Sequence, residues 1–326
     1  MIDLLDIMRA LADPTRLRIV FLALRLELSV GELVQILGQS QPRVSRHIRI
    51  LNEAEILKRR KEGSWVFIQP GPVLSDGKLT PLFADVDLTH ARAFQRDLLK
   101  LDEVRAARTQ MAAEYFAVHA KEWDSLRSLH VADSEVEDAI SSILRSAPLG
   151  SVLDIGTGTG RMMELFAADS SHFVALDNSS DMLRLARAKL GNMNSASAAK
   201  VDIRMGDFNK LPFEADTFDT ILFHQVLHYA QDPERVIAEA VRVLAPSARL
   251  MIVDFAAHER EELRTVHAHA RLGFADELIS NAFHDNGVRL VHQRVLDGGA
   301  LVVKMWVGQK QDLAPGIENN IIRIVA

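Results

Sequence analysis

The sequence has no cysteine among its 326 residues. This absence excludes disulfides, thiolate metal sites and cysteine nucleophiles together. Long hydrophobic runs are also missing, because no stretch approaches 18 uncharged apolar residues, so we expect no membrane-spanning helix. Asp3 and Asp6 interrupt the basic and apolar layout that a signal peptide would need. These absences together favour a cytoplasmic protein.

An overall excess of positive charge is missing too, although one region is basic. The formal net charge is −6, which is unlike a nucleic-acid binder as a whole. Between Arg43 and Lys61, seven basic residues accompany only Glu53 and Glu55, so this region carries +5 and the remainder −11. The region is either an ordinary solvated surface or a patch that confines affinity for phosphates to one face. Its position on a predicted recognition helix and hairpin favours the second interpretation.

Two short helices joined by a tight turn are predicted after a first helix that Asp13 caps. S-V-G-E-L-V-Q-I-L predicts a helix capped by Ser29, with Glu32 completing a capping box. G-Q-S ends it, and Ser40 is the expected cap of the next helix. One face of that helix is aliphatic and would pack inward, through Val44, Ile48 and Leu51. The opposite face would point outward and carries Gln41, Arg43, Ser45, Arg46 and Arg49.

K-R-R-K-E-G-S-W-V-F-I-Q then predicts a hairpin around Gly63–Ser64, with basic residues at its base. Helix-turn-helix plus hairpin is a winged helix, which lays one helix in the major groove and the hairpin against the DNA backbone. The stretches A-L-A-D-P-T-R-L-R-I-V, L-S-V-G-E-L, S-Q-P-R-V-S-R-H-I-R-I-L and K-R-R-K-E-G-S-W-V resemble the ArsR family of bacterial repressors over roughly residues 5–70. The resemblance implies a homodimer on palindromic operator DNA. The expected DNA contacts are Gln41, Arg43, Ser45, Arg46, Arg49, Arg60 and Lys61.

Many ArsR-type proteins bind metals, but we expect no metal site here. The family's cysteine pair in the L-x-V-x-E-L helix is replaced by Ser29 and Gly31. Asp87 and His90 offer another type of ligand, yet a lone pair of polar residues is more typical of a surface. His258, His267 and His269 are also interpreted as surface or interface residues, since the last two would face different sides of a helix.

A connector follows the predicted winged helix. Pro70, Gly71, Pro72, Gly77 and Pro81 mark a turn-rich stretch. A long helix is then expected, with an apolar stripe formed by Leu88, Ala91, Phe94, Leu98 and Leu101. This stripe packs either within the chain or, as we favour, at a dimer seam. Tyr115 and Trp123 lie where a lid over a ligand would begin, although core packing explains them equally well.

A glycine-rich loop dominates the second half of the sequence. The apolar strand S-V-L-D-I is followed by Gly156, Gly158 and Gly160, which would let the backbone approach a ligand closely. The spacing G-x-G-x-G, with Asp154 before it, fits a pyrophosphate-binding fingerprint poorly, and no lysine follows to make a P-loop. Asp177 closes the next strand, 17 residues after Gly160, where a carboxylate can accept both ribose hydroxyls of an adenosine.

Five β/α units ending in a hairpin across D-G-G predict a doubly wound, seven-stranded sheet whose terminal strand is antiparallel. D-I-G-T-G-T-G, A-L-D, G-D-F and F-D-T-I-L-F-H-Q-V-L-H resemble class I S-adenosylmethionine-dependent methyltransferases, of the subgroup that is similar to quinone methyltransferases, over about residues 110–310. The resemblance implies that Asp154 and the glycine loop hold the methionine moiety and Asp177 the ribose. The remaining cofactor contacts it implies are Thr157 in the loop, Asn178 or Met182 on the adenine, Asp207 and Phe208 at its edge, His224 near the methyl group and Tyr115 in the lid.

We therefore expect a winged-helix domain at residues 1–85, a helical connector that contributes to dimerisation and a cofactor lid at 86–145, a Rossmann-like methyltransferase domain at 146–310 and a tail at 311–326. The expected function is a DNA-binding regulator whose methyltransferase domain acts on a small molecule, with His224 or His228 as base and Asp254 as a further candidate. The alternative, which resembling ArsR-type regulators imply, is a catalytically inactive sensor of S-adenosylhomocysteine or S-adenosylmethionine that controls methionine-cycle genes. The same pocket would serve both. R-L-G-F-A-D-E-L at 271–278 is expected to begin the lid or acceptor side.

Overall fold

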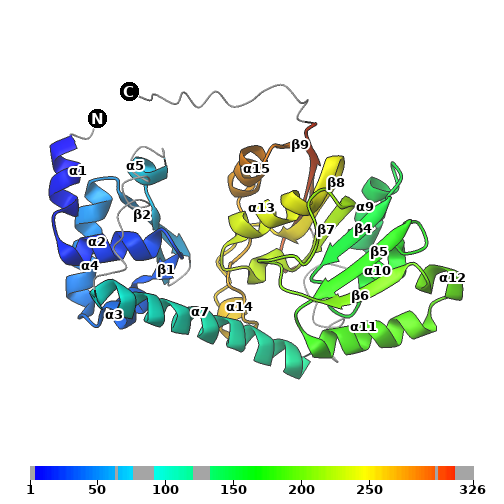
Figure 1. The fold of residues 1–326 in the computed structure, drawn as a ribbon, viewed down its shortest axis with the longest axis horizontal. Coiled ribbons are helices and arrows are strands. Elements are labelled where there is room, and N and C mark those ends of the chain that lie inside the picture. The colour runs from blue at the N-terminus through cyan, green and yellow to red at the C-terminus, as the bar shows by residue number, and fades with distance from the viewer. Residues whose placement is uncertain (1–3, 63–64, 76–91, 120–132, 298–299, 313–326) are drawn as a thin grey trace. The chain divides into compact units, whose positions relative to one another are not determined.

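The structure is a computed structural model that describes residues 4–62, 65–75, 92–119, 133–297 and 300–312 (Figure 1). The chain divides into two compact units. The first contains Met1–Glu114 together with Glu259–Leu272, and the second contains Tyr115–His258 together with Gly273–Ala326. A short segment from the second half of the sequence therefore packs with the first half. Among the described helices, none is long and apolar enough to cross a membrane.

The first unit is built on the predicted winged helix. Its elements in chain order are α1 (Leu4–Leu11), α2 (Pro14–Ala23), β1 (Leu28–Ser29), α3 (Val30–Leu37), α4 (Gln41–Glu53), β2 (Leu57–Glu62), β3 (Trp65–Pro70) and α5 (Pro72–Ser75). The strands form an antiparallel sheet in the order β1-β3-β2. Val44, Ile48 and Leu51 on α4 are fully buried, so the expected inward face of the recognition helix is confirmed.

Local hydrogen bonds explain where these helices begin and end. The carboxylate of Asp13 accepts the backbone N–H groups of Thr15 and Arg16 at 2.8 and 3.0 Å. Ser29 and Glu32 form the predicted capping box, with bonds of 3.2 and 2.8 Å. Ser40 occupies the predicted cap position of α4, although its side chain makes no capping hydrogen bond.

Helix α7 (Arg92–His119) packs on the winged helix of its own chain. Phe94 meets Phe21 edge to face, with 5.0 Å between ring centroids, and Leu101 is fully buried. The guanidinium of Arg18 donates to both carboxylate oxygens of Asp97 at 2.5 and 2.6 Å. Phe94 and Leu101 of the predicted apolar stripe therefore pack within the chain, which was the alternative to the favoured dimer seam. Leu88, Ala91, Asp87 and His90 lie outside the described residues.

The buried Asp97 gives the first testable prediction. Asp97 is 1% exposed, and its hydrogen bonds raise the pKa of Arg18 against the effect of burial. Asp97→Ala leaves the Arg18 charge without its carboxylate and should lower the free energy of unfolding by about 3 kcal/mol. Denaturant unfolding measures this loss. Glu103→Ala, an exposed carboxylate on the same helix, is the matched control and should change stability very little.

The second unit is the doubly wound α/β fold that the sequence predicts. Its strands are β4 (Ser151–Ile155), β5 (His172–Asp177), β6 (Val201–Met205), β7 (Phe218–His224), β8 (Leu244–Phe255), β9 (Val288–Leu296) and β10 (Val303–Lys310). They form one sheet in the order β6-β5-β4-β7-β8-β10-β9. The first five strands in that order are parallel, and β10 runs antiparallel to both β8 and β9. The predicted seven strands, the terminal antiparallel strand and the β9–β10 pairing are confirmed.

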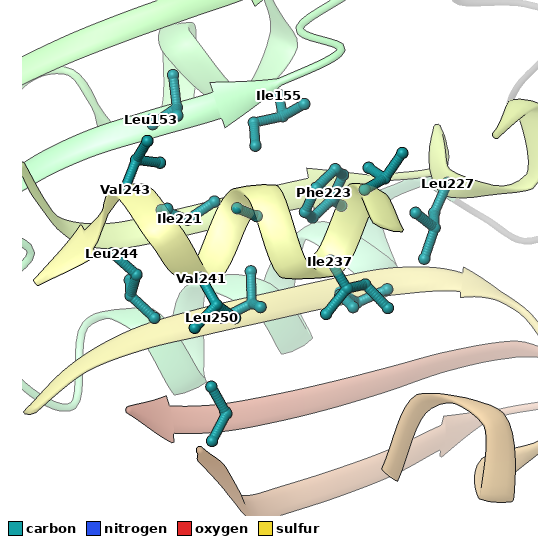
Figure 2. Close-up of a cluster of buried hydrophobic side chains, with 14 of the residues drawn as sticks. Leu153, Ile155, Ile221, Phe223, Leu227, Ile237, Val241, Val243, Leu244 and Leu250 are labelled. Atoms are coloured by element: carbon teal, nitrogen blue, oxygen red, sulfur yellow. The ribbon is translucent and has the colours of Figure 1, made fainter. Parts of the chain in front are cut away.

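The helices of this unit are α9 (Asp133–Leu144), α10 (Arg161–Phe166), α11 (Ser180–Asn192), α12 (Ser195–Ala198), α13 (Pro233–Val243) and α15 (Asp276–Asp285), with the short 3-10 helix η3 (Leu227–Tyr229). Figure 2 shows α13 lying over the sheet, with Ile237 and Val241 beside the strand residues Ile221 and Leu250. The central strands are nearly continuous apolar runs because they are covered on both faces. This core fixes the sheet whose edge carries the candidate site.

Candidate functional site

The polar residues predicted for the ligand site gather at one edge of the parallel strands. Asp154 precedes the last residue of β4, Asp177 ends β5 and His224 ends β7. Asp207 follows β6 by two residues, and Asp254 precedes the last residue of β8. Because these strands are parallel and hydrogen-bonded in register, their carboxyl ends lie together. Ligands of open α/β sheets bind at this edge.

The loop after β4 turns back on itself through glycines in the left-handed region. The φ angles of Gly156, Gly158 and Gly160 are 73°, 55° and 84°. The N–H groups of Gly156 and Thr157 donate to the carbonyl of Leu176 at 2.8 and 2.9 Å, which ties the loop to β5. The hydroxyl of Thr157 is buried and has no hydrogen-bond partner within the described residues. The loop therefore presents an unsatisfied polar atom beside the strand edge.

Asp177 is held in place by the backbone of the same loop. Its Oδ2 accepts the N–H of Gly158 at 2.9 Å, and its Oδ1 accepts the N–H of Ser179 at 2.8 Å. Burial raises the pKa of this carboxyl group, while the surrounding backbone N–H groups act in the opposite direction. Each carboxylate oxygen retains a second lone pair, so this oriented group can still accept hydroxyl hydrogen bonds.

Gly156 gives a second prediction, because a side chain there would meet two obstacles. Its φ of 73° is strained for other residues, and an added Cβ would lie 2.2 Å from Cγ2 of Val226. Gly156→Ala should lower the free energy of unfolding by about 2 kcal/mol. Combining it with Val226→Ala should recover part of that loss in thermal unfolding. Gly191→Ala is the control, since nothing lies within 4 Å of its added Cβ, and it should be neutral or slightly stabilising.

The residues expected around the adenine occupy the next two strand ends. Asn178 is exposed directly after β5, while Met182 is buried in the first turn of α11. Asp207 is exposed, and its Oδ1 accepts from the backbone and side-chain nitrogens of Asn209 at 2.9 and 2.7 Å. Phe208 packs partly against the core. Tyr115 lies in α7, and its side chain is outside the described residues, as is Trp123.

The two candidate histidines differ in their surroundings. His228 is buried, and its Nδ1 lies 2.7 Å from Oδ1 of Asp254, which is fully buried and also accepts the N–H of Phe255 at 2.8 Å. The backbone N–H of His228 donates to Oδ2 of Asp254 at 3.2 Å. This pair fastens the end of β8 to the turn after β7. His224 keeps partial exposure at the strand end and is the more accessible of the two.

Among the described residues, no group of histidine and carboxylate side chains has the arrangement of a metal site. His267 and His269 do not lie on a helix, contrary to the prediction from the sequence. Helix α14 (Glu262–Val266) ends before both residues, and their rings lie 6.4 Å apart between centroids.

The predicted DNA contacts lie mostly on the exposed face of α4. Gln41, Arg43, Arg46 and Arg49 are exposed, and Ser45 is partly exposed. Burial lowers the pKa of His47 on the same helix, and neighbouring arginines add to this effect against the attraction of Asp13. Lys61 is exposed on the wing strand β2. Arg60 differs from these residues, because its guanidinium makes two bonds of 2.8 and 3.1 Å to the carboxylate of Glu27.

Comparison with known proteins gives a family match for the winged helix and another for the α/β fold. Residues 13–59 match the family described as "Bacterial regulatory protein, arsR family", and residues 153–252 match the one described as "Methyltransferase domain". Phosphatidylethanolamine N-methyltransferase of Cereibacter sphaeroides is 32% identical over 161 residues, which are 47% of this chain and 76% of that protein. The chain belongs to the methyltransferase family. An ArsR-family winged helix-turn-helix domain is fused in front of its methyltransferase domain.

The methyltransferase domain has other relatives, which it covers less fully. Demethylmenaquinone methyltransferase of Clavibacter sepedonicus is 34% identical over 104 residues, 32% of this chain, so the chain spans only 40% of that relative's length. Magnesium protoporphyrin IX methyltransferase from Synechocystis PCC 6803 has the same fold, with a TM-score of 0.52 and 15% identity. The match covers 62% of this chain and 100% of that one.

Two features of the methyltransferase domain were not predicted from the sequence. Gln225 follows His224 with a φ of 51° and is buried, and its N–H donates to the carbonyl of Val253 at 2.7 Å. Val226 then packs against Gly156. The sequence H-Q-V-L-H located this turn but carries no signal for a left-handed glutamine. The turn joins the strand end at His224 to the glycine loop.

Proposed function

We propose that this protein is a DNA-binding transcriptional regulator whose methyltransferase domain binds S-adenosylmethionine or S-adenosylhomocysteine. The observation that carries the proposal is the glycine loop whose own N–H fixes the carboxylate of Asp177 at the carboxyl edge of the sheet. A loop of glycines, which lets the backbone approach a ligand, and an oriented carboxylate together suit an adenosine that carries a small polar substituent. The match to the methyltransferase family supports the same ligand class.

The residues present fit this cofactor. The buried hydroxyl of Thr157 has no hydrogen-bond partner among the described residues, and three glycines with positive φ shape the loop around it. Asp154 and the loop would hold the methionine moiety, and Asp177 the ribose hydroxyls. The further contacts would come from Asn178, Met182, Asp207 and Phe208 around the adenine, from His224 near the sulfonium and from Tyr115 in the lid.

Bound S-adenosylmethionine supplies an activated methyl group. The contribution of this chain to a transfer reaction would be to orient the acceptor and to exclude water. His224 would take a proton from an acceptor, and its partial exposure at the end of β7 supports this role. His228 would instead hold the turn in position through Asp254. The names of the relatives, a phospholipid and a quinone methyltransferase, favour a small-molecule acceptor over a nucleic acid.

A second candidate function is a sensor that binds the cofactor or its product without turnover. The observation that favours it is that Glu259–Leu272, from within the methyltransferase half, belongs to the same compact unit as the winged helix. A ligand that acts on this segment would reach the DNA-binding unit through the covalent chain. The ligand shifts the equilibrium only by its differential affinity for the two states.

We also propose a homodimer on palindromic DNA. The exposed side chains of Leu4, Leu5 and Met8 form an apolar face on α1 that a second copy would cover. Sedimentation of the full chain should give twice its mass of 36.3 kDa.

Calorimetric titration tests the proposed function. The full chain is titrated with S-adenosylmethionine and with S-adenosylhomocysteine, alone and with a duplex that the protein has selected from a random-sequence library. Much tighter binding of the product, changed by DNA, supports the sensor because coupling is reciprocal. Comparable binding of both, unaffected by DNA, supports the enzyme. Binding of neither would refute the proposal.

A further inference from the structure

The segment Glu259–Leu272 lies within the connection between β8 and α15. This connection leaves β8 after Phe255 and returns to it at Phe274, at the ligand edge of the methyltransferase sheet. The N–H of Phe274 donates to the carbonyl of Phe255 at 2.9 Å, and the N–H of Ala257 donates to the carbonyl of Phe274 at 3.1 Å. Gly273 permits this close approach, since a Cβ there would lie 2.1 Å from the carbonyl oxygen of Ala256. We call residues 259–272 the docking loop.

The docking loop shares one carboxylate with the wing. The side chain of Glu27, immediately before β1, forms ion pairs with Arg60 of the wing strand β2 and with Arg271 of the docking loop. The side chains of Glu27 and Arg271 are only 10% and 9% exposed. Two guanidinium groups therefore compete for a single, largely desolvated carboxylate, where charge interactions are strong.

A second contact joins the same two elements. The guanidinium carbons of Arg60 and of Arg264 each lie 5.0 Å from the ring centroid of Phe67 on β3. Arg264 also donates to the carbonyl of Ala270 at 2.7 Å, so it is anchored within the docking loop. The loop thus contacts the wing hairpin through Glu27 and through Phe67.

We propose that the docking loop couples the cofactor site to DNA binding by setting how tightly Glu27 holds Arg60. This inference rests on the proposed function, because it takes Arg60 as a phosphate contact and the strand edge as the cofactor site. The base of the docking loop is fixed at the end of β8, beside Asp254 and His228. A ligand that changes the geometry of this edge moves the loop and withdraws Arg271. Glu27 then holds Arg60 alone and keeps it from the DNA backbone.

Two substitutions should change DNA affinity in opposite directions. Arg271→Met removes one of the two cations from Glu27, so Arg60 is held more tightly and DNA affinity should fall about 3- to 10-fold. Glu27→Gln releases Arg60 and should raise DNA affinity by a similar factor. Both substitutions should abolish the effect of S-adenosylhomocysteine on DNA affinity, which in the unaltered chain we expect to be within the usual 5- to 150-fold range. A purely structural role would lower DNA affinity in both variants.

The experiment measures DNA affinity of the full chain and both variants by fluorescence anisotropy, with and without S-adenosylhomocysteine. Circular dichroism verifies folding. Arg260→Gln is the matched control, because this half-buried arginine of the docking loop pairs locally with Glu262 at 2.6 Å, and it should keep the coupling. Amide hydrogen exchange of residues 259–272 on adding DNA gives a second readout that does not depend on the ligand.

The outcomes separate this inference from the function beneath it. Opposite shifts in the two variants, loss of coupling in both and a change of exchange in the docking loop support the inference. If the unaltered chain binds both DNA and S-adenosylhomocysteine but neither changes the other, the coupling is refuted while the proposed function stands. If the coupling survives in Arg271→Met, the Glu27 contact is not its route and the inference is also refuted. Failure to bind either partner refutes the proposed function itself.

Discussion

Replacing Asp177 with alanine is expected to weaken binding of S-adenosylhomocysteine about 100-fold. The carboxylate would accept two ribose hydroxyls, and hydrogen bonds to a charged group contribute about 1.5 kcal/mol or more each, or about 3 kcal/mol together. The loss is reinforced because the same carboxylate fixes the N–H of Gly158 in the glycine loop. Isothermal titration of the full chain measures the change directly.

The pH dependence of the same titration provides a second signature. Burial raises the pKa of Asp177, so its carboxylate takes up a proton at a higher pH than an ordinary aspartate does. Affinity of the unaltered chain should therefore decline early as the pH falls, and this decline should be missing in Asp177→Asn. Asp169→Asn serves as the control, because this exposed residue pairs with Arg145 at 2.9 Å, before the amino end of β5. Unchanged affinity in Asp177→Ala would exclude the strand edge as the adenosine site.

Removing Arg43 and Arg46 together should weaken DNA binding about 100-fold at moderate salt, since each arginine contact contributes about 1–3 kcal/mol. Both residues are exposed on α4, the proposed recognition helix. Each phosphate contact also contributes about 0.9 to the slope of log affinity against log salt concentration. If both contact phosphates, the slope should fall by about 2, and if they read bases, affinity should fall with little change in slope. Anisotropy titrations over a series of salt concentrations distinguish these roles.

The control for this pair is Arg145→Ala, which removes an exposed cation from the methyltransferase unit and should leave DNA affinity unchanged. The affinity of the Arg43/Arg46 double variant for the cofactor should stay within about a factor of two of that of the unaltered chain, measured at high salt. Retained DNA affinity in the double variant would exclude α4 as the recognition helix.

Local signals in the sequence predicted most of the fold correctly. Asp13 and the Ser29–Glu32 pair cap their helices as expected, because a capping bond depends on residues three positions apart or fewer. The strand ends at Ile155 and Asp177 were also correct, since buried parallel strands are continuous apolar runs.

What the sequence did not predict depends on contacts between distant residues. The apolar stripe of α7 predicted that Phe94 and Leu101 are buried but not by which partner. The positive φ of Gln225 is imposed by tertiary packing against β8. The pairing of Glu27 with Arg271 joins residues 244 positions apart, and neither has any local feature that identifies the other.

The first compact unit is made of two separate stretches of the sequence, and this limits where the protein can be divided into fragments. A fragment ending near Glu114 would contain every element of the winged helix but would lack Arg264 and Arg271. In the whole chain, Arg271 pairs with Glu27 and Arg264 covers the ring of Phe67. The methyltransferase half, expressed alone, would display the docking loop with no surface to receive it. The two halves are therefore not interchangeable modules. A transplant of either into another fusion would have to carry its matching surface with it.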